Sequence, residues 1–514
     1  IANHLLHLGV KKGDKVAILS ANMPNWGITQ FAIANIGAIA VPILPGFCST
    51  ELQNILEHAE VKVIFVSRLL AKCLEGVKTP FLEHKILINN FATMPEGCYQ
   101  PEDLDKLVPD INLNNTTPLP EVSIEEEDIA SIIYTSGTTG FSKGVVLTHK
   151  NLVWDARQCR TIQPVDETYR FLSILPMAHT YENTLGLLLP LMFGAQVYYL
   201  DRVPTPKLLV PAMQKIRPTV VLSVPLIIEK IYKSQVLPKF TSSKLMSKLY
   251  QFAPARKLLN RLAGKKLMET FGGELKFFGI GGSKLDGTVE QFLREAKFPY
   301  AIGYGLTETA PMAAGSNPSQ TFLQGVGPVM EGVQIKINDP DKSGQGEIWI
   351  KGPNVMKGYY KRPELTAETF TEDGWFKTGD LGSFDKKNRL AIRGRIKTMI
   401  LGASGENIYP EEIESIINNF RFVNESLVVE NSGKLVAMVH FNMEELEKQY
   451  QKLKDQAGNY KEKINDYIEE QKQELRDYVN ARVNNFSKLQ LVLVQHEPFE
   501  KTPTHKIKRF LYCK

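Results

Sequence analysis

The first part of the chain alternates short apolar runs with segments in which apolar residues recur at helical spacing. The runs Val16 to Leu19, Ala38 to Leu44 and Val61 to Val66 predict buried strands, and Trp26 to Ile36 and Ser49 to His58 predict the helices between them. This strand and helix order is typical of a parallel sheet with helices packed on it. We therefore predict an α/β fold.

Two later apolar runs lead directly into glycines. Phe277 to Ile280 continues as Gly281-Gly282-Ser283, and Tyr300 to Ile302 continues as Gly303-Tyr304-Gly305. Ligands of open α/β sheets bind at the carboxyl ends of strands. The two glycine-rich exits are therefore candidate parts of one ligand site.

The pattern changes after residue 325. The runs Gln334 to Ile337, Gly346 to Lys351 and Arg389 to Arg393, separated by glycine and proline turns, predict a small antiparallel or barrel-like subdomain over 325–394. Asp380 follows what we interpret as a tight turn there. We predict a large N-terminal domain over 1–394 and a small, mobile α+β domain over 395–514. Within the latter, residues 444–480 predict one or two long exposed helices as an insertion.

Composition narrows the function classes. The 514 residues carry a net charge of +5, with 43% hydrophobic and 23% charged residues, which are ordinary values for a globular protein and favour no nucleic-acid partner. Five cysteines lack a C-x-x-C pair, so a cytoplasmic location fits and a zinc site does not. The uncharged run from Asn183 to Leu200 contains Pro190 and predicts a buried helix and a strand rather than a membrane span. The chain begins at Ile1 without an initiator Met, so we expect native residues to precede it.

The most suggestive motif follows the predicted strand Ile129 to Ile133. The residues Thr135-Ser136-Gly137-Thr138-Thr139-Gly140, with Lys143 shortly after, combine hydroxyls, glycines and one cation. Backbone amides in such a loop form a nest for anions. The spacing does not match a Walker A motif, and a plain surface turn is the alternative. A polyphosphate site is the functional interpretation.

Several motifs in this order resemble those of the adenylate-forming (AMP-binding) acyl-CoA synthetases, and most closely the bacterial long-chain fatty acid–CoA ligases. They are the phosphate-type loop, Gly303 to Glu308, Lys377 to Asp380, Gly394 to Lys397 and the terminal Lys506. The match extends over nearly the whole chain. It implies a ligase that uses ATP, Mg²⁺ and CoA.

The resemblance implies roles in nucleotide binding. Residues 135–140 and Lys143 would hold the β- and γ-phosphates, Thr307 would contact the α-phosphate, and Glu308 would hold Mg²⁺, which suits one carboxylate plus phosphate oxygens. In the nucleoside half of the site, the implied adenine contacts are Tyr304 and Gly305 on one side and Gly281, Gly282 and Ser283 on the other, and the implied ribose contacts are Asp380 and Arg395.

Lys506 resembles the family lysine that reaches both the attacking carboxylate and the α-phosphate. In relatives the C-terminal domain rotates after adenylation; Lys397 falls at the hinge position and Gly405 matches a glycine that lines the thiol path. Thr398, Ser404 and His505 depart from the family pattern, and the first two departures bear on the thiol tunnel.

The segment Leu175 to Glu182 is similar to the version of this motif in long-chain ligases, with His179 as a candidate for gating the acyl pocket. The runs 183–200 and 220–228 would either line an apolar tunnel or form ordinary core. An aryl-acid or amino-acid adenylating enzyme is the alternative, since Glu182 could pair with a substrate amine. A scaffold with an inactive nucleotide pocket is the alternative from another class. A lipidic substrate leads us to expect peripheral contact with the inner face of a membrane, and the oligomeric state stays open.

Overall fold

The protein is described by a computed structural model, which covers residues 1–111, 117–135, 142–200, 202, 204–241, 243–401, 407–431, 433–453, 460–502 and 506–512. Its chain divides into two compact units. Unit 1 comprises residues 1–336, 349–377 and 385–390, and unit 2 comprises 337–348, 378–384 and 391–514. Among the described residues, no helix combines the length and apolar character needed to cross a bilayer.

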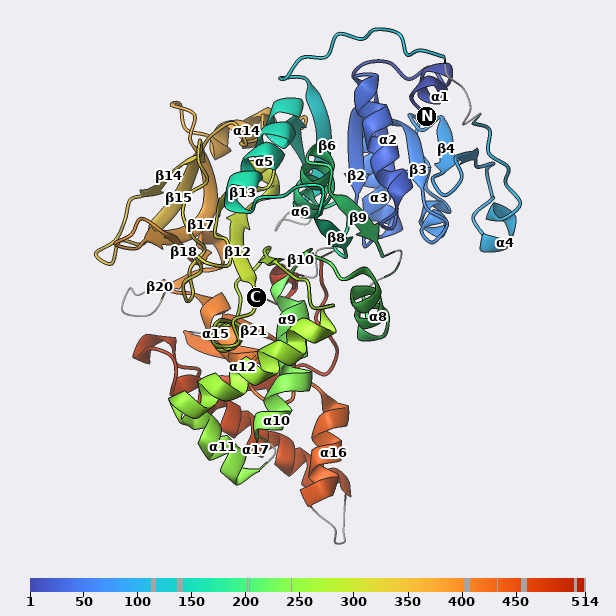
Figure 1. Ribbon diagram of the computed structural model, residues 1–514. Coiled ribbons are helices and arrows are strands. Elements are labelled where there is room, and N and C mark those ends of the chain that lie inside the picture. The colour runs from blue at the N-terminus through green and yellow to red at the C-terminus, as the bar shows by residue number, and fades with distance from the viewer. Residues whose placement is uncertain are drawn as a thin grey trace. The chain divides into compact units, whose positions relative to one another are not determined.

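The first sheet of unit 1 has eight strands in the order β16-β7-β6-β2-β1-β3-β4-β5. Figure 1 labels β6, β2, β3 and β4 of this sheet, in that order across the view. The strands are β1 Lys15–Leu19, β2 Ile39–Ile43, β3 Val61–Val66, β4 His84–Leu87, β5 Ala92–Thr93, β6 Ile129–Thr135, β7 Lys143–Thr148 and β16 Gly358–Tyr359. The central strands β6, β2, β1, β3 and β4 run parallel, whereas β7, β16 and β5 add antiparallel edges.

Helices of this layer are α1 Ala2–His7, α2 Pro24–Asn35, α3 Ser49–Ala59, α4 Pro101–Leu104 and α5 His149–Ile162. Every residue of β2 is buried, and so are all residues of β1 except Lys15. Strands covered on both faces read as continuous apolar runs, which explains why the predicted strands and the helices α2 and α3 are confirmed within one or two residues.

The second sheet of unit 1 has six strands in the order β13-β12-β11-β10-β8-β9. They are β8 Arg170–Ser173, β9 Gln196–Tyr199, β10 Val220–Ser223, β11 Phe277–Ile280, β12 Tyr300–Gly305 and β13 Met312–Gly315. All neighbours from β9 to β12 run parallel, and β13 is antiparallel. Buried Asn22 links the two layers, since its side chain donates to the Ser173 hydroxyl and to the Leu175 carbonyl.

The remaining helices of unit 1 accompany this sheet and the connections around it. They are α6 Thr180–Glu182, α7 Leu189–Met192, α8 Pro206–Ile216, α9 Pro225–Ile231, α10 Leu237–Thr241, α11 Lys244–Gln251, α12 Ala253–Thr270, α13 Gly287–Glu295 and α14 Pro363–Thr369. The uncharged run from Asn183 forms a π-helical turn, α7 and then β9, so the predicted helix and strand are confirmed.

The β-rich segment forms a four-stranded sheet in the order β14-β15-β17-β18. Its strands are β14 Gln334–Asn338, β15 Gly346–Lys351, β17 Phe376–Phe384 and β18 Leu390–Arg395. The three predicted strands are confirmed, but the interpretation that Asp380 directly follows a tight turn is wrong. Asp380 lies in the middle of β17, a strand whose glycines concealed it in the sequence.

Unit 2 continues with β19 Ile400–Leu401, β20 Asn407–Ile408, α15 Pro410–Ile417, β21 Val423–Asn431, β22 Lys434–Phe441, α16 Met443–Leu453, α17 Tyr460–Asn480 and β23 Leu491–Val494. The two helices predicted in 444–480 are present, but they are not simply exposed. Leu446, Tyr450, Leu475 and Val479 are buried in the core of unit 2. Where the structure describes side chains of these two helices, the charged residues lie outside this core, as in an ordinary amphipathic helix.

Candidate nucleotide and acyl site

A chain of three polar side chains connects the end of the predicted phosphate loop to the predicted magnesium ligand. Lys143 Nζ donates to the Tyr359 hydroxyl at 3.4 Å and lies 4.5 Å from the centre of its ring. The Tyr359 hydroxyl donates to Glu308 Oε1 at 2.9 Å. The antiparallel pairing of β16 with β7, in which Tyr359 faces Val145, brings the tyrosine to this position.

Tyr359 is a site residue that the sequence analysis missed. It is separated from Lys143 by 216 residues and from Glu308 by 51, and nothing in the Gly358-Tyr359-Tyr360 run signals a ligand. Its contacts hold the Glu308 carboxylate through Oε1. Among the described residues, no group of three His, Cys, Asp or Glu side chains could hold a metal by itself. A single carboxylate nevertheless fits Mg²⁺ when nucleotide phosphates and water supply the other ligands.

The two glycine-rich strand exits lie next to each other because β11 and β12 are parallel neighbours, with Ile280 facing Ile302. After β11, Gly282 has a φ of +87° and is exposed with Ser283, whereas Gly281 is buried. After β12, Tyr304 is 8% exposed. The parallel register therefore places the two predicted adenine contacts at one edge of the sheet.

Packing alone requires a glycine at position 305. A Cβ there would lie 1.7 Å from the Pro311 carbonyl oxygen, far inside any contact distance. Thr307 and Glu308 follow in the 3₁₀ turn Thr307–Thr309. The Met356 amide donates to the Glu308 carbonyl at 2.9 Å, so the backbone of the carboxylate residue is fixed as well.

The predicted ribose contacts lie together in unit 2. Arg395 Nε is 2.9 Å from Asp380 Oδ1, and the Asp380 side chain is 5% exposed whereas the Arg395 side chain is 46% exposed. The Asp380 amide also donates to the Thr378 hydroxyl at 3.0 Å. The carboxylate thus points from a strand toward a cation 15 positions later in the sequence, a pairing that short-range motif spacing did not predict.

Lys397 and Lys506 are both exposed residues of unit 2. Lys397 lies in the 3₁₀ turn Ile396–Thr398, where the Thr398 hydroxyl donates to Glu411 Oε1 at 2.6 Å. The backbone of Lys506 is fixed by two hydrogen bonds: its amide donates to the Thr502 hydroxyl at 3.2 Å, and the Thr502 amide donates to its carbonyl at 2.8 Å. Residues 136–140 of the phosphate-type loop and Gly405 lie outside the described residues.

The predicted gate histidine caps a short helix. His179 Nδ1 accepts a hydrogen bond from the Tyr181 amide at 3.2 Å at the start of α6, and the preceding strand ends at Ser173 rather than at Pro176. This cap is a structural role for His179. It places the ring at the strand exit of β8 without requiring a ligand.

Glu182 is a buried acid. It is 1% exposed, and burial raises the pKa of its carboxyl to about 8. A Cβ on Gly186 would lie 2.6 Å from its Oε1, so the helix packs closely against the carboxyl. Burial therefore favours the uncharged form of this carboxyl, which makes it a poor partner for an ammonium group.

The two apolar runs that could form a tunnel do meet at a cavity. Leu185 and Leu189 from the first run and Val220 and Leu222 from the second line an apolar space of about 50 Å³. A water molecule takes about 30 Å³ in the liquid, and ligand pockets generally exceed about 300 Å³. In this conformation the runs are therefore packed core around a small void.

A family model and two similar relatives place this chain in the same family. The family model described as AMP-binding enzyme matches residues 1–360. Fatty acyl-CoA synthetase A of Dictyostelium discoideum is 27% identical over 99% of this chain and 81% of its own. Long chain acyl-CoA synthetase 6, peroxisomal, of Arabidopsis thaliana is 29% identical over 99% of this chain and 77% of its own.

Solved structures agree with the fold. The crystal structure of ATP-bound MatB from Rhodopseudomonas palustris superposes with a TM-score of 0.74 at 22% identity, covering 99% of this chain and 90% of that protein. The predicted α/β fold class and the predicted family are both confirmed.

Proposed function

Because this chain belongs to the family of AMP-binding enzymes, we propose that it is a long-chain fatty acid–CoA ligase that uses ATP. The observation that carries the proposal is the chain of contacts from Lys143 through Tyr359 to Glu308. These contacts join the end of a loop suited to polyphosphate to a carboxylate suited to Mg²⁺. The relatives named as long-chain acyl-CoA synthetases support the choice of substrate.

The proposed reaction has two steps. A carboxylate oxygen of the fatty acid attacks the α-phosphorus of ATP, which forms acyl-AMP and releases pyrophosphate. The CoA sulfur then attacks the acyl carbon, and AMP leaves with one of the original carboxylate oxygens while the thiol proton passes to solvent. Bound Mg²⁺ would neutralise charge on the phosphate oxygens.

We assign the first step to the following side chains. The loop of residues 135–140 and Lys143 hold the leaving pyrophosphate, Thr307 contacts the α-phosphate and Glu308 holds the metal. Lys506 neutralises charge between the attacking carboxylate and the α-phosphate, where removing one such donor costs about 10²–10³ in rate.

The nucleoside is proposed to lie at the glycine edge of the second sheet. Tyr304 and the Gly281 to Ser283 turn contact adenine there, with Gly305 allowing the close approach, and Asp380 accepts from the ribose hydroxyls with Arg395 beside it. The pairing of Asp380 with Arg395 supports this assignment, because the arginine already holds the carboxylate in one orientation.

The second step requires a different set of groups at the reacting carbon. We propose that the C-terminal domain over 395–514 rotates about Lys397, removes Lys506 and lets the pantetheine thiol pass Gly405. A compact unit that continues from Ala391 to the C-terminus supports a boundary near this hinge.

The acyl chain is proposed to enter between the 183–200 and 220–228 runs by widening the small void between them. Two findings support a hydrocarbon over an amine-bearing acid: the void is lined by apolar side chains, and burial favours the uncharged form of Glu182. His179, at the start of α6, is proposed to gate this opening. A cytoplasmic enzyme that contacts the inner face of a membrane would obtain such substrates from the bilayer.

Pyrophosphate release tests the proposal directly. Medium and long fatty acids, aryl acids and amino acids are each incubated with ATP and Mg²⁺, with and without CoA. We expect release with fatty acids, and thioester only when CoA is added. Glu308→Gln, which keeps the shape and removes the charge, should abolish release. A strict preference for an amino acid or an aryl acid would overturn the proposed substrate class.

A further inference from the structure

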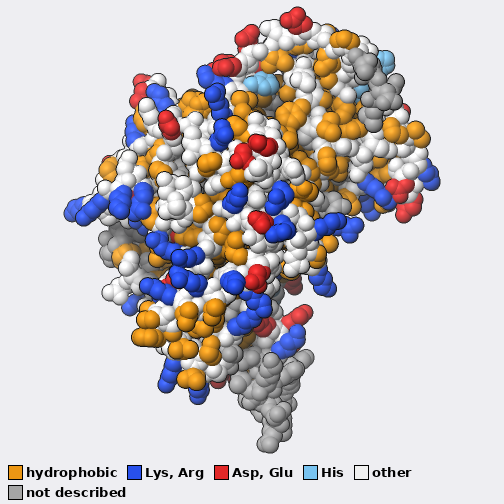
Figure 2. All heavy atoms as spheres, viewed as in Figure 1, with side chains coloured by type: hydrophobic (Ala, Val, Ile, Leu, Met, Phe, Trp, Pro, Cys, Tyr) orange, Lys and Arg blue, Asp and Glu red, His pale blue; other side chains and the backbone are white. Residues whose placement is uncertain are grey.

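Helices α11 and α12 present an apolar surface to solvent that the ligase site does not use. We call this surface the α11–α12 face and define it by Leu245, Leu249, Phe252, Leu258 and Leu262, which are 41–77% exposed. Leu245 and Leu249 are four residues apart on α11, and Leu258 and Leu262 are four apart on α12, so each pair lies on one side of its helix. Figure 2 shows hydrophobic side chains gathered at the lower left of the view, where Figure 1 places α11 and α12.

The orientation of α11 is fixed by contacts on its other side. The Tyr250 ring stacks on Phe240 with centroids 4.6 Å apart, and its hydroxyl donates to Asn260 Oδ1 at 2.9 Å. No residue of α11 is buried. Isolated helices of this length are marginal in water, so an apolar outer face on such a short helix is consistent with a further surface that packs on it.

A strong local positive charge surrounds the apolar residues. Residues 237–270 contain eight Lys or Arg and a single acid, Glu269, although the whole chain has a net charge of only +5. The mild total charge therefore conceals a basic segment. Exposed lysines and an arginine border the leucines on both helices, namely Lys244, Lys248, Lys257, Arg261, Lys265 and Lys266.

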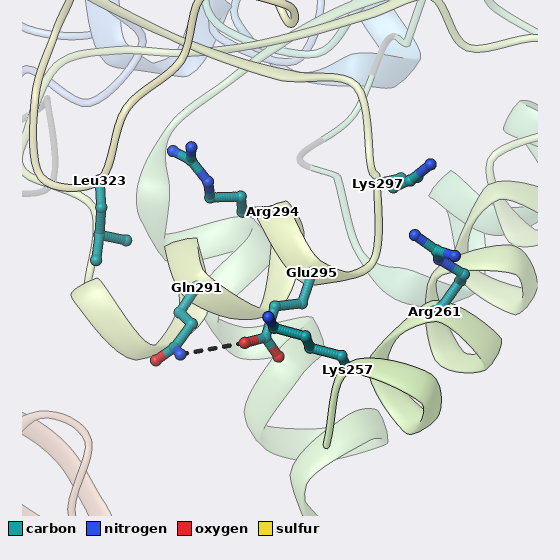
Figure 3. Close-up of a pocket in the computed structure, with 7 residues that line it drawn as sticks. All are labelled: Lys257, Arg261, Gln291, Arg294, Glu295, Lys297 and Leu323. Atoms are coloured by element: carbon teal, nitrogen blue, oxygen red, sulfur yellow. Dashed lines mark hydrogen bonds between the residues drawn. The ribbon is translucent and has the colours of Figure 1, made fainter. Parts of the chain in front are cut away.

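A cationic pocket adjoins this face. Lys257 and Arg261 of α12 line it together with Arg294 and Lys297, and its volume is about 400 Å³ (Figure 3). Its one acid, Glu295, is already paired, since it accepts hydrogen bonds from Arg256, Asn260 and Gln291. Among the described residues, none of the four lining cations has a carboxylate within ion-pair distance. The pocket thus has the size and charge for a phosphate-bearing head group.

We propose that the α11–α12 face docks on an anionic lipid bilayer, with the leucines and Phe252 in the acyl boundary and the cationic pocket at the lipid phosphates. Helices with Lys and Arg beside Leu and Phe bind membrane interfaces in this way. A nucleic acid would match the charge but would leave the leucines exposed to water. The proposal deepens the suggested membrane contact, and it does not depend on the ligase activity.

Vesicle flotation of the full chain without ATP or fatty acid tests it. Phosphatidylcholine vesicles with about 30 mol% phosphatidylglycerol should bind the protein. Neutral vesicles should bind it at least tenfold less, because each of several cations near an anionic surface contributes about fivefold. Raising the salt concentration from about 0.1 M to about 0.5 M should weaken binding, as screening requires.

Substitutions distinguish this face from general stickiness. Leu249→Gln, Leu258→Gln and Leu262→Gln combined should lower the bound fraction about tenfold or more, and Lys257→Gln with Arg261→Gln should lower it on anionic vesicles only. The matched control carries three substitutions at exposed positions elsewhere in unit 1, namely Leu69→Gln, Lys386→Gln and Lys387→Gln. This control should bind vesicles like the parent chain. Urea midpoints should show that all variants remain folded.

Equal binding to neutral and anionic vesicles would overturn the proposal, and so would full binding by the leucine variants. Tighter binding to duplex DNA than to anionic vesicles would assign the face to nucleic acid instead. These measurements omit the substrates, so their failure is separate from a failure of the ligase proposal. Pyrophosphate release with a water-soluble, medium-chain fatty acid measures the ligase activity without membranes.

Discussion

Substitution of Glu182 by glutamine tests whether the carboxyl beside the proposed acyl path is buried and uncharged. The folded chain holds this carboxyl with a pKa near 8, raised by burial from an ordinary 4.5. Between those two values the folded state keeps a proton that the unfolded state loses, so the free energy of unfolding falls as the pH rises through this window and then levels off. At about 1.4 kcal/mol per pH unit, the total over this window is about 5 kcal/mol.

Glu182→Gln keeps the shape and removes the titration. We expect little change in stability near pH 5 and an increase of a few kcal/mol near pH 8.5. Urea unfolding followed by tryptophan fluorescence measures this well, because all four tryptophans of the chain belong to unit 1. They are Trp26, Trp154, Trp349 and Trp375.

Glu167→Gln, at an exposed position of the same unit, is the control and should change stability equally at both pH values. The Glu182 variant should also retain activity on fatty acids, since a neutral carboxyl contributes no charge to substrate binding. If the stability difference between Glu182→Gln and the parent chain is the same at pH 5 and at pH 8.5, the carboxyl is charged or solvated in the folded chain and is not held neutral by burial.

Three further predictions concern the nucleotide site. Tyr359→Phe removes the hydroxyl that contacts the predicted magnesium carboxylate at 2.9 Å. Because hydrogen bonds to charged groups are worth about 1.5–3 kcal/mol, the KM for MgATP should rise about tenfold or more. The control substitution Tyr360→Phe should leave this KM unchanged. Gly305→Ala would place a Cβ 1.7 Å from the Pro311 carbonyl oxygen, so we expect a lower thermal midpoint and no nucleotide binding, and a native-like midpoint would contradict the packing argument. Lys506→Ala should abolish pyrophosphate release yet still convert added acyl-adenylate and CoA into thioester, and equal loss of both half-reactions would contradict the two-conformation account.

Much of the fold was predictable because its strands are buried on both faces. The runs that became β1, β2 and β3 are nearly continuous apolar stretches, and no other element type fits them at that length. β17 was not predicted, since Gly379 and Gly382 interrupt its pattern and are typical of turns.

Only those residues of the candidate site that stand within a recognisable sequence motif were predictable. Lys143 and Glu308 stand in recognisable motifs, but Tyr359 connects them from a position that is distant in sequence from both. The environment of Glu182 was also beyond sequence analysis, because the same residue would be charged at a surface and is neutral when buried. The leucines of α11 and α12 have the spacing of core residues and yet face solvent. Whether such leucines are buried or exposed depends on where the neighbouring helices lie.

The fate of the carboxylate oxygens distinguishes an acyl-adenylate intermediate from other routes to the thioester. A fatty acid carrying ¹⁸O at both carboxylate positions is incubated with ATP, Mg²⁺ and CoA, and the products are separated and weighed by mass spectrometry. The account predicts one ¹⁸O atom in the phosphate of AMP and the other in the thioester carbonyl, because AMP departs with the oxygen that attacked the α-phosphorus. Unlabelled AMP, or label in inorganic phosphate with ADP as the nucleotide product, would contradict an acyl-adenylate intermediate.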